Sequence, residues 1–187
     1  MPTHRQQSFL ATLWRDHYPV HTLDALEGKP VWVHRIGTAL PPGSSLASTV
    51  RNDSAMLGCH PGVTGAAMVF YFRHKPGGYR LYAREPGRHF GKGVYLDKSG
   101  YLGLQPTHRY DPTPFGLYSL TGAPLSLQEL EGDTHTLTLA CKGAPIALAR
   151  RANNRYHYLA TTNSPTQPWR LRILERQVPW VSTPDET

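Results

Sequence analysis

The sequence predicts an all-β protein in which three four-stranded units close into one antiparallel barrel, with a short amphipathic helix in front of them. The main observation is a phrase of similar residues that occurs three times, each time followed 10–13 residues later by a large aromatic side chain that opens an apolar alternation. The phrases are centred on Leu57, Leu102 and Leu159, and the aromatic residues are Phe70, Phe115 and Trp169. The chain also contains 17 glycines and 17 prolines, which suits many short strands joined by turns. A repeat of this length predicts the architecture of a whole domain.

The bulk composition is that of one folded domain. Of the 187 residues, 39% are hydrophobic and 18% are charged, whereas a disordered chain has fewer apolar residues and a higher net charge. No stretch approaches the ~18 consecutive apolar residues of a membrane-spanning helix, and the first residues lack the apolar core of a secretory signal. We therefore expect a protein without a membrane span that is cytoplasmic, or exported by a route without a cleavable signal peptide.

The chain is basic, with a formal net charge of +7 and an isoelectric point of about 9.6. Its Lys and Arg residues are scattered, and Arg150-Arg151 is the one local doublet. A nucleic-acid partner is therefore a weaker expectation than it would be for a basic tract. Cys59 and Cys141 are too few for a disulfide framework or a cysteine-based zinc site, so we expect two free thiols.

The N-terminal segment has an apolar pattern that predicts a helix. Phe9, Leu10, Leu13 and Trp14 fall on one helical face, and Pro19 would end the helix. This segment is predicted to pack against the main domain. The expected organisation is a helical cap over residues 1–27, a barrel domain over residues 28–175 and a C-terminal tail over residues 176–187.

From Gly28 onward the apolar pattern has a period of two, which is typical of half-buried strands. The breaks between the runs carry Gly, Pro, Asn or Asp, which adopt the backbone angles of tight turns. The predicted strands cover residues 31–33, 68–72, 79–82, 93–96, 100–104, 115–118, 125–127, 135–140, 146–148, 156–160 and 169–174. They group into units over residues 28–72, 73–118 and 119–174, and closure of the three units would remove the sheet edges.

Two stretches resemble the β-trefoil superfamily. The run Gly93-Val94-Tyr95-Leu96-Asp97-Lys98-Ser99-Gly100-Tyr101-Leu102 is similar to a hairpin of fascin-like and ricin-B-like trefoils, and Gln167-Pro168-Trp169 is similar to the Gln-x-Trp closure of ricin-B lectin repeats. The resemblance covers about residues 28–175. It implies a β-trefoil whose loops bind a glycan or the surface of another protein, including inhibitor or effector roles, and it implies ligand-binding roles for Gln167 and Trp169.

The second unit concentrates side chains that suit sugar recognition. An aromatic face packs on the C–H surface of a sugar, and carboxylates or amides bond to its hydroxyls. The candidate ligand-binding residues in this unit are Tyr95, Asp97, Tyr101, Gln105, His108 and Tyr110. A structural reading stays open, in which Tyr95 and Tyr101 belong to the barrel core and Asp97 serves its turn. Asp53, Asp97 and Asn154 occupy nearly matching places in the three units, which fits turn chemistry and binding alike.

Motifs for catalysis or cofactors are sparse. The ten histidines are dispersed singly, without the spacing of a metal site, so neither a metal nor a cofactor is expected. One enzyme alternative is an ADP-ribosyltransferase-like protein that uses NAD, because residues 89–96 are similar to a stretch of poly-ADP-ribose-polymerase-like transferases. His34 would then stand for the motif histidine, and Glu131 or Glu175 would supply the carboxylate. The function that the sequence favours is a non-enzymatic module that binds a glycan or a protein surface, with nucleic-acid binding as a further alternative.

Overall fold

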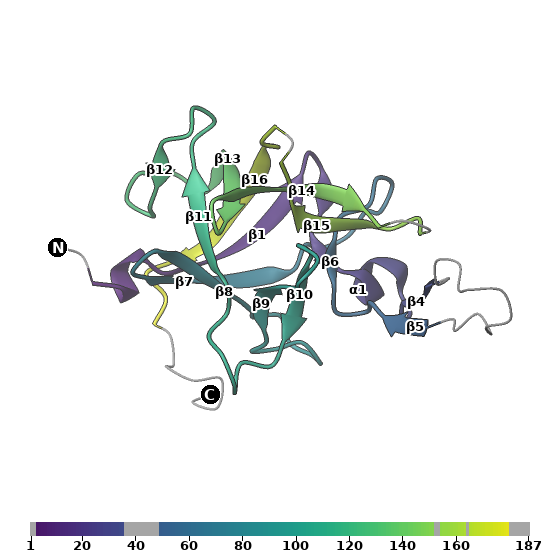
Figure 1. Cartoon of the computed structure of the whole chain (residues 1–187). Coiled ribbons are helices and arrows are strands. Elements are labelled where there is room, and N and C mark those ends of the chain that lie inside the picture. The colour runs from purple at the N-terminus through teal and green to yellow at the C-terminus, as the bar shows by residue number, and fades with distance from the viewer. Residues whose placement is uncertain (1–2, 36–48, 152–153, 164, 180–187) are drawn as a thin grey trace, which may run out of the picture.

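The computed structural model describes residues 3–35, 49–151, 154–163 and 165–179, and it is all-β with 5% helix. Six antiparallel strands form a closed barrel (Figure 1). Each strand pairs with the next in the order β1, β7, β8, β11, β13 and β16, and β16 pairs back with β1. The barrel strands are β1 (Phe9–Arg15), β7 (Val69–Lys75), β8 (Gly78–Ala83), β11 (Pro114–Tyr118), β13 (Thr134–Cys141) and β16 (Trp169–Arg176). Closure leaves no free edge in this wall.

Apart from the helix before β1, the remaining helices and strands lie in the segments that connect the barrel strands. We call these connecting segments excursions. The short helix η1 (Arg5–Gln7) precedes β1, and β12 (Pro124–Leu125) pairs with β11. The excursion after β8 holds β9 (Gly93–Leu96) and β10 (Leu102–Gln105), and the excursion after β13 holds β14 (Ala144–Arg150) and β15 (His157–Thr161). The longest excursion follows β1 and comprises β2 (Tyr18–Pro19), β3 (His21–Thr22), α1 (Leu23–Glu27), β4 (Trp32–Arg35), β5 (Thr49–Asn52) and β6 (Leu57–Gly58).

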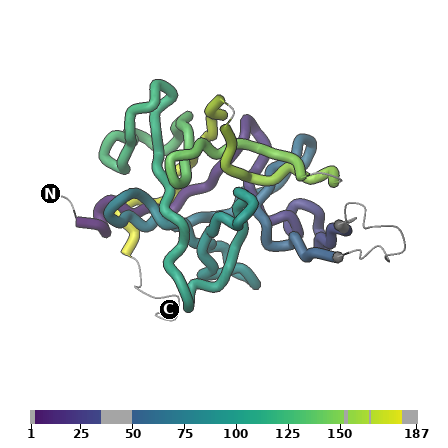
Figure 2. Tube along the Cα trace, in the orientation of Figure 1, coloured from purple at the N-terminus to yellow at the C-terminus, as the bar shows by residue number. Residues whose placement is uncertain are grey.

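The excursion after β1 builds one end of the molecule. Strands β4 and β5 pair only with each other, as a separate two-stranded sheet. Figure 2 shows α1 and this sheet at one end of the chain trace and η1 at the other. Helix α1 ends at Gly28, whose φ of 67° is left-handed and favours glycine. Of the described helices, none has the length and apolar character to cross a membrane.

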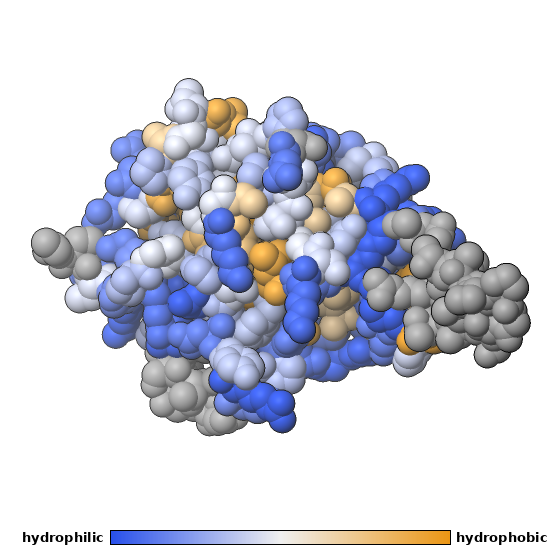
Figure 3. Space-filling model, viewed as in Figure 1, coloured by the Kyte–Doolittle hydropathy of each residue, from blue (hydrophilic) through white to orange (hydrophobic). Residues whose placement is uncertain are grey.

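The barrel interior is filled by alternate side chains of the six strands, as the pleat of a β-strand requires. Phe9 stacks on Phe72 with ring centroids 4.7 Å apart. Trp169 is fully buried and donates its indole N–H to the Ile146 carbonyl at 3.0 Å. On the outer face that Figure 3 shows, hydrophobic residues form small patches separated by hydrophilic ones. Burial of these large side chains is the main source of stability.

The predicted N-terminal helix is wrong, and so is the predicted β-trefoil of three four-stranded units. Residues 9–15 form the strand β1, which pairs with both β7 and β16. The molecule is a closed six-stranded barrel with further strands outside it. The barrel therefore begins inside the segment that was predicted to be a separate cap. The physical reason is that β1 is apolar on both faces: Phe9, Ala11 and Leu13 point into the core, while Leu10 packs against Tyr71, Tyr82 and Val178 outside it.

Candidate functional site

The three recurring phrases lie next to one another in the structure. Tyr158 in β15 pairs with Gly58 in β6, Met56 bridges to Gly103, and Tyr101 bridges to Ala160. Polar side chains that accompany the phrases therefore meet, although they are far apart in the chain. They form what we call the Arg151 network, which consists of Arg51, Asp53, Asp97, Tyr101, Arg151, Asn154 and Tyr158.

Asp53 and Asp97 are the two acceptors of this network. Asp53 is 1% exposed and receives two hydrogen bonds from Arg51, at 2.5 and 2.8 Å, and one from the Tyr158 hydroxyl at 2.7 Å. Asp97 receives a hydrogen bond from Arg151 at 2.6 Å and also accepts the backbone N–H groups of its own turn. Burial and the Asp53 carboxylate raise the pKa of Tyr158, so this tyrosine remains a neutral donor.

The aromatic side chains complete the network around Arg151. The guanidinium of Arg151 lies 3.9 Å from the ring centroid of Tyr101 and 5.0 Å from that of Tyr158. The two tyrosine rings meet edge to face at 5.5 Å. Asp97 and Tyr101 are two of the predicted ligand-binding residues. In the structure, the Asp97 carboxylate and the Tyr101 ring both contact Arg151 of the same chain. These contacts fit the structural alternative for Asp97 and Tyr101, and their ligand-binding role stays a prediction.

The other predicted site residues differ in burial. Trp169 is buried in the core. Gln167 is half-buried just before β16 and accepts the Leu148 N–H of β14 at 3.1 Å, so it links these two segments. The Tyr95 hydroxyl donates to the Tyr110 carbonyl. The exposed members all belong to the loop between β10 and β11 or to the end of β10: Gln105, His108 and Tyr110, of which Tyr110 is 76% exposed.

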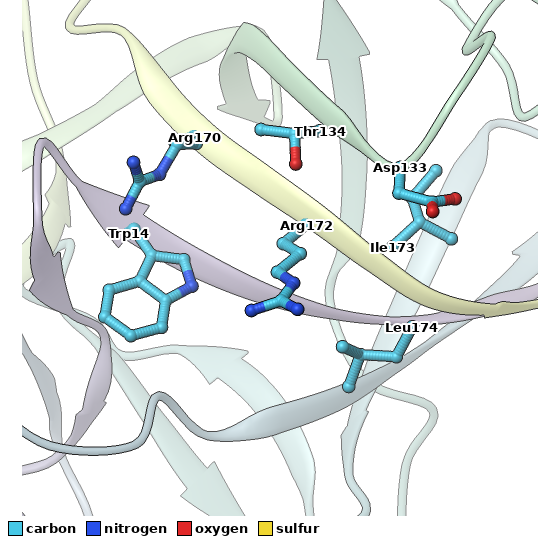
Figure 4. A pocket seen from close by; sticks show the side chains of 7 residues that line it. All are labelled: Trp14, Asp133, Thr134, Arg170, Arg172, Ile173 and Leu174. Atoms are coloured by element: carbon cyan, nitrogen blue, oxygen red, sulfur yellow. The ribbon is translucent and has the colours of Figure 1, made fainter.

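A concave surface lies on the outer wall of the barrel, away from the Arg151 network. A cavity of about 630 Å³ opens over β1, β13 and β16, and its lining residues are Trp14, Asp133, Thr134, Arg170, Arg172, Ile173 and Leu174. We call it the Arg170 groove. Figure 4 shows the Arg170 side chain on β16 reaching toward Trp14 on β1, with the Arg172 side chain beside them. The groove contains an aromatic ring, two cationic groups and one carboxylate.

The register of the three strands sets the arrangement of this groove. Arg170 is paired with Trp14 on one side and with Thr136 on the other. Arg172 is paired with Thr12 on one side and with Thr134 on the other. Directly paired residues share a face of the sheet, so the outer wall carries two parallel rows, each with an arginine at its centre. At ~3.3 Å per residue, the rows are about 6.6 Å apart.

The Trp14 ring is held in place in this groove, and both arginines are accessible. Trp14 donates its indole N–H to the Thr12 hydroxyl at 2.9 Å, which fixes the ring, and the Arg170 guanidinium lies 5.7 Å from the ring centroid. Arg170 and Arg172 are exposed, and within the described part of the chain neither forms an ion pair with a carboxylate. Two unneutralised guanidinium groups beside an ordered indole can bind carboxylate, sulfate or phosphate groups in a planar, bidentate manner.

Sequence reasoning did not find the Arg170 groove. Trp14 was expected on a helix, and the two arginines alternate with core residues of the last predicted strand. The signal that was present is the Arg170-Leu171-Arg172 alternation, which places both arginines on one face of a strand. Trp14, which completes the groove, lies on β1, more than 150 residues before Arg170 in the chain.

A third group of polar residues lines a cavity of about 290 Å³ between α1 and the segment after β8. His21 bonds to Glu85 at 2.8 Å through Nε2, and its Nδ1 accepts the Thr22 N–H at 2.8 Å. His89 bonds to Asp24 at 3.2 Å through Nε2, and its Nδ1 lies 3.4 Å from the Lys92 ammonium. Because both nitrogens of each imidazole are engaged, neither histidine is presented to a substrate as a general base. These pairs connect β3 and α1 to the segment that follows β8.

The residues that the sequence suggested for the transferase alternative lie on different elements. His34 lies on β4, Glu175 lies on β16, and Glu131 is exposed in the loop before β13. Cys59 and Cys141 are free and buried, and burial raises the pKa of each thiol to about 11, which keeps them protonated. Among the described residues, no group of three or more His, Cys, Asp or Glu side chains is arranged to hold a metal ion.

Comparisons with known proteins add no relative from which a role could be transferred. No family model matches the chain, and neither a curated protein nor a solved structure matches it. The interpretation of this molecule therefore depends on its own geometry.

Proposed function

We propose that this protein is a glycan-binding module whose Arg170 groove recognises an acidic carbohydrate. The observation that carries the proposal is the pair of unneutralised guanidinium groups, Arg170 and Arg172, beside the ordered indole of Trp14. The site lies on three strands of a closed barrel and not on a mobile loop. Side chains held by a sheet keep their geometry, which lowers the entropic cost of binding.

The chemistry of the groove matches an acidic sugar chain group by group. The guanidinium groups bind carboxylate or sulfate oxygens with paired hydrogen bonds. The indole packs on the C–H face of a sugar ring. Thr134 and the Asp133 carboxylate lie at the other side of the groove, where they can bond to neutral hydroxyls.

The charge distribution also suits a polymer with regularly spaced anionic groups. Because Arg170 and Arg172 stand in adjacent rows about 6.6 Å apart, one extended chain can contact both. The net charge of +7 draws an anionic chain toward the protein over a longer range, an effect that salt weakens.

The test is a binding measurement on the double variant R170A/R172A. We expect its affinity for sulfated or uronic-acid-containing oligosaccharides, measured by calorimetry at physiological salt, to be lower than that of the unchanged protein by about tenfold or more. The control is R109A, which removes one exposed guanidinium from the loop between β10 and β11. It is compared with the single variants R170A and R172A, each of which removes the same single charge. All of these variants should keep the melting temperature, since all three arginines are exposed.

A glycan array and a set of oligonucleotides identify the ligand class. Binding to acidic glycans that R170A/R172A loses and R109A keeps supports the proposal. A silent array, or glycan binding that both variants retain, contradicts it. Tighter binding to single-stranded DNA or RNA than to any glycan would replace the carbohydrate by a nucleic acid, and capture of a protein with no glycan signal would favour the protein-surface alternative.

A further inference from the structure

A separate cavity lies between η1 and β7 and concentrates positive charge. Its volume is about 160 Å³, and its lining residues are His4, Arg5, Ser8, Tyr71, Arg73 and His74. Two of these side chains are permanently cationic, two become cationic on protonation, and none is a carboxylate. Like charges that share a small space repel one another, so such a grouping is favourable only when an anion or a loss of protons offsets the repulsion.

His4 and His74 form the most unusual contact in this cavity. Their Nδ1 atoms lie 2.8 Å apart, with ring centroids at 5.1 Å and planes inclined by 31°. One Nδ1 must donate a proton and the other must accept it, so the contact holds a single proton. If both Nδ1 atoms were protonated, two donors would face each other without an acceptor. A fully protonated pair therefore requires an external acceptor between or beside the rings.

The surrounding backbone and side chains hold this pair in position. The buried Ser8 hydroxyl accepts the backbone N–H of His74 at 3.0 Å and donates to the backbone carbonyl of His4 at 2.8 Å. The Tyr79 ring on β8 meets His74 edge to face at 5.4 Å. Ser8 therefore links the backbone of His4 to that of His74, which keeps the two residues adjacent.

Among the described residues that line this cavity, the groups that face the pair are cationic or neutral. Arg5 belongs to η1, and Arg73 belongs to β7 and also hydrogen-bonds to the Tyr82 hydroxyl. Tyr71 donates to the Val178 carbonyl, and Tyr79 accepts the Leu127 N–H. Burial raises the pKa of both tyrosines, so they remain neutral near pH 7. Within the described residues, no carboxylate forms an ion pair with His4 or His74. Burial and the neighbouring His4 lower the pKa of His74.

We propose that this cavity binds a tetrahedral oxyanion of the sulfate or phosphate class, with Arg5, Arg73 and the protonated His4–His74 pair as its donors. The oxygens of such an anion supply the acceptors that the two imidazolium groups lack. The cavity accommodates the oxyanion but is smaller than most pockets for drug-sized ligands. This site is independent of the Arg170 groove, which lies over β1, β13 and β16.

Binding of the anion is coupled to uptake of a proton. A pair with both imidazoles protonated binds the anion better than a pair that shares one proton, so the affinity for the anion rises as the pH falls. If binding of the anion is accompanied by uptake of one proton, the affinity for the anion changes by up to about tenfold per pH unit. By reciprocity, the anion makes both histidines easier to protonate.

Sulfate is the first probe, because its charge does not change between pH 5.5 and 7.5. In NMR spectra of the imidazole resonances at constant ionic strength, we expect sulfate to shift His4 and His74 in a saturable manner, with about tenfold tighter binding at pH 5.5 than at pH 7.5. Chloride at the same ionic strength should not reproduce the shift. H4Q and R5A should each weaken sulfate binding at least about fivefold, and both sites are exposed, so the fold should tolerate the changes.

The controls separate this site from surface charge and from the Arg170 groove. H108Q removes an exposed histidine elsewhere and should leave sulfate binding unchanged. R170A/R172A should keep the sulfate response of His4 and His74, while H4Q should keep the glycan affinity, so either proposal can fail alone.

Inorganic phosphate and O-phosphoserine are tested as two further ligands. Binding of phosphate alone identifies a free anion, and equal binding of both identifies a phosphate carried by a larger molecule. A non-saturable shift, an equal response to chloride, or full binding by H4Q overturns the proposal.

Discussion

Asp53 is a buried carboxylate that joins separate segments of the chain. It accepts hydrogen bonds from Arg51 in its own segment and from Tyr158 in β15. Removing one partner of a buried ion pair leaves the other partner desolvated and unpaired, which costs more than the pair itself contributes. The position of Asp53 therefore matters for the fold, whatever the protein binds.

The variant D53A should lower the free energy of unfolding by about 3 kcal/mol, because it leaves Arg51 and the buried Tyr158 hydroxyl without their acceptor. D97A should lower it by about 1 kcal/mol, since the Asp97 side chain is 31% exposed and water replaces part of what is lost. Urea denaturation measures both values. If D97A abolished glycan binding and left the denaturation midpoint unchanged, Asp97 would be a ligand residue and not a structural one.

Strand β1 shows how two periodicities can be confused in a short segment. The positions of Phe9, Leu10, Leu13 and Trp14 fit one face of a helix, yet the segment is the strand that closes the barrel. Ala11 separates the two interpretations. On the predicted helix it would lie away from the apolar face, whereas in β1 it is completely buried.

The variant A11K should therefore unfold the protein or lower the free energy of unfolding by several kcal/mol, because it forces a charge into the barrel core. The variant E175K introduces the same side chain at an exposed position of the neighbouring strand β16 and should remain folded. Circular dichroism with thermal denaturation distinguishes the two. An A11K protein as stable as E175K would contradict the placement of residues 9–15 in the barrel wall.

The molecule as a whole carries several histidines whose protonation opposes folding. Burial lowers the pKa of His60, His74, His89 and His157 from the ordinary value of 6.5. The unfolded chain therefore binds protons more readily than the native protein as the pH falls below about 6.5. The contribution of these neutral histidines is present above that pH and is lost as the pH falls through their lower native pKa values.

We expect the urea midpoint to fall steadily between pH 7.5 and pH 5, with a smaller slope in H60Q and H157Q than in the unchanged protein. Sulfate should offset part of the loss, because it stabilises the protonated His4–His74 pair. Fluorescence-monitored denaturation across this pH range measures the slope. A midpoint that rises on acidification would show that the buried histidines gain, and do not lose, favourable contacts when charged.

The local pattern of this chain was sufficient to predict most of its strands. Period-two alternation between Gly and Pro breaks predicted residues 68–72, 79–82, 93–96, 115–118, 135–140 and 169–174, and each of these ranges overlaps an observed strand. The short strands β2, β3 and β6 were not predicted, because two residues are too few to show a period. The recurrence of the Leu phrases was interpreted as three trefoil units, which is wrong, although the phrases do lie next to one another and form bridges.

By itself, the sequence determined that this is an all-β chain with turns at its Gly- and Pro-rich breaks, because those properties depend on neighbouring residues. Only the tertiary structure decided that residues 9–15 close the barrel, that Asp97 and Tyr101 serve the Arg151 network, and that Trp14 meets Arg170. Each of these outcomes depends on strand pairing between distant segments. A pairing register depends on the packing of the whole core, which no local pattern contains.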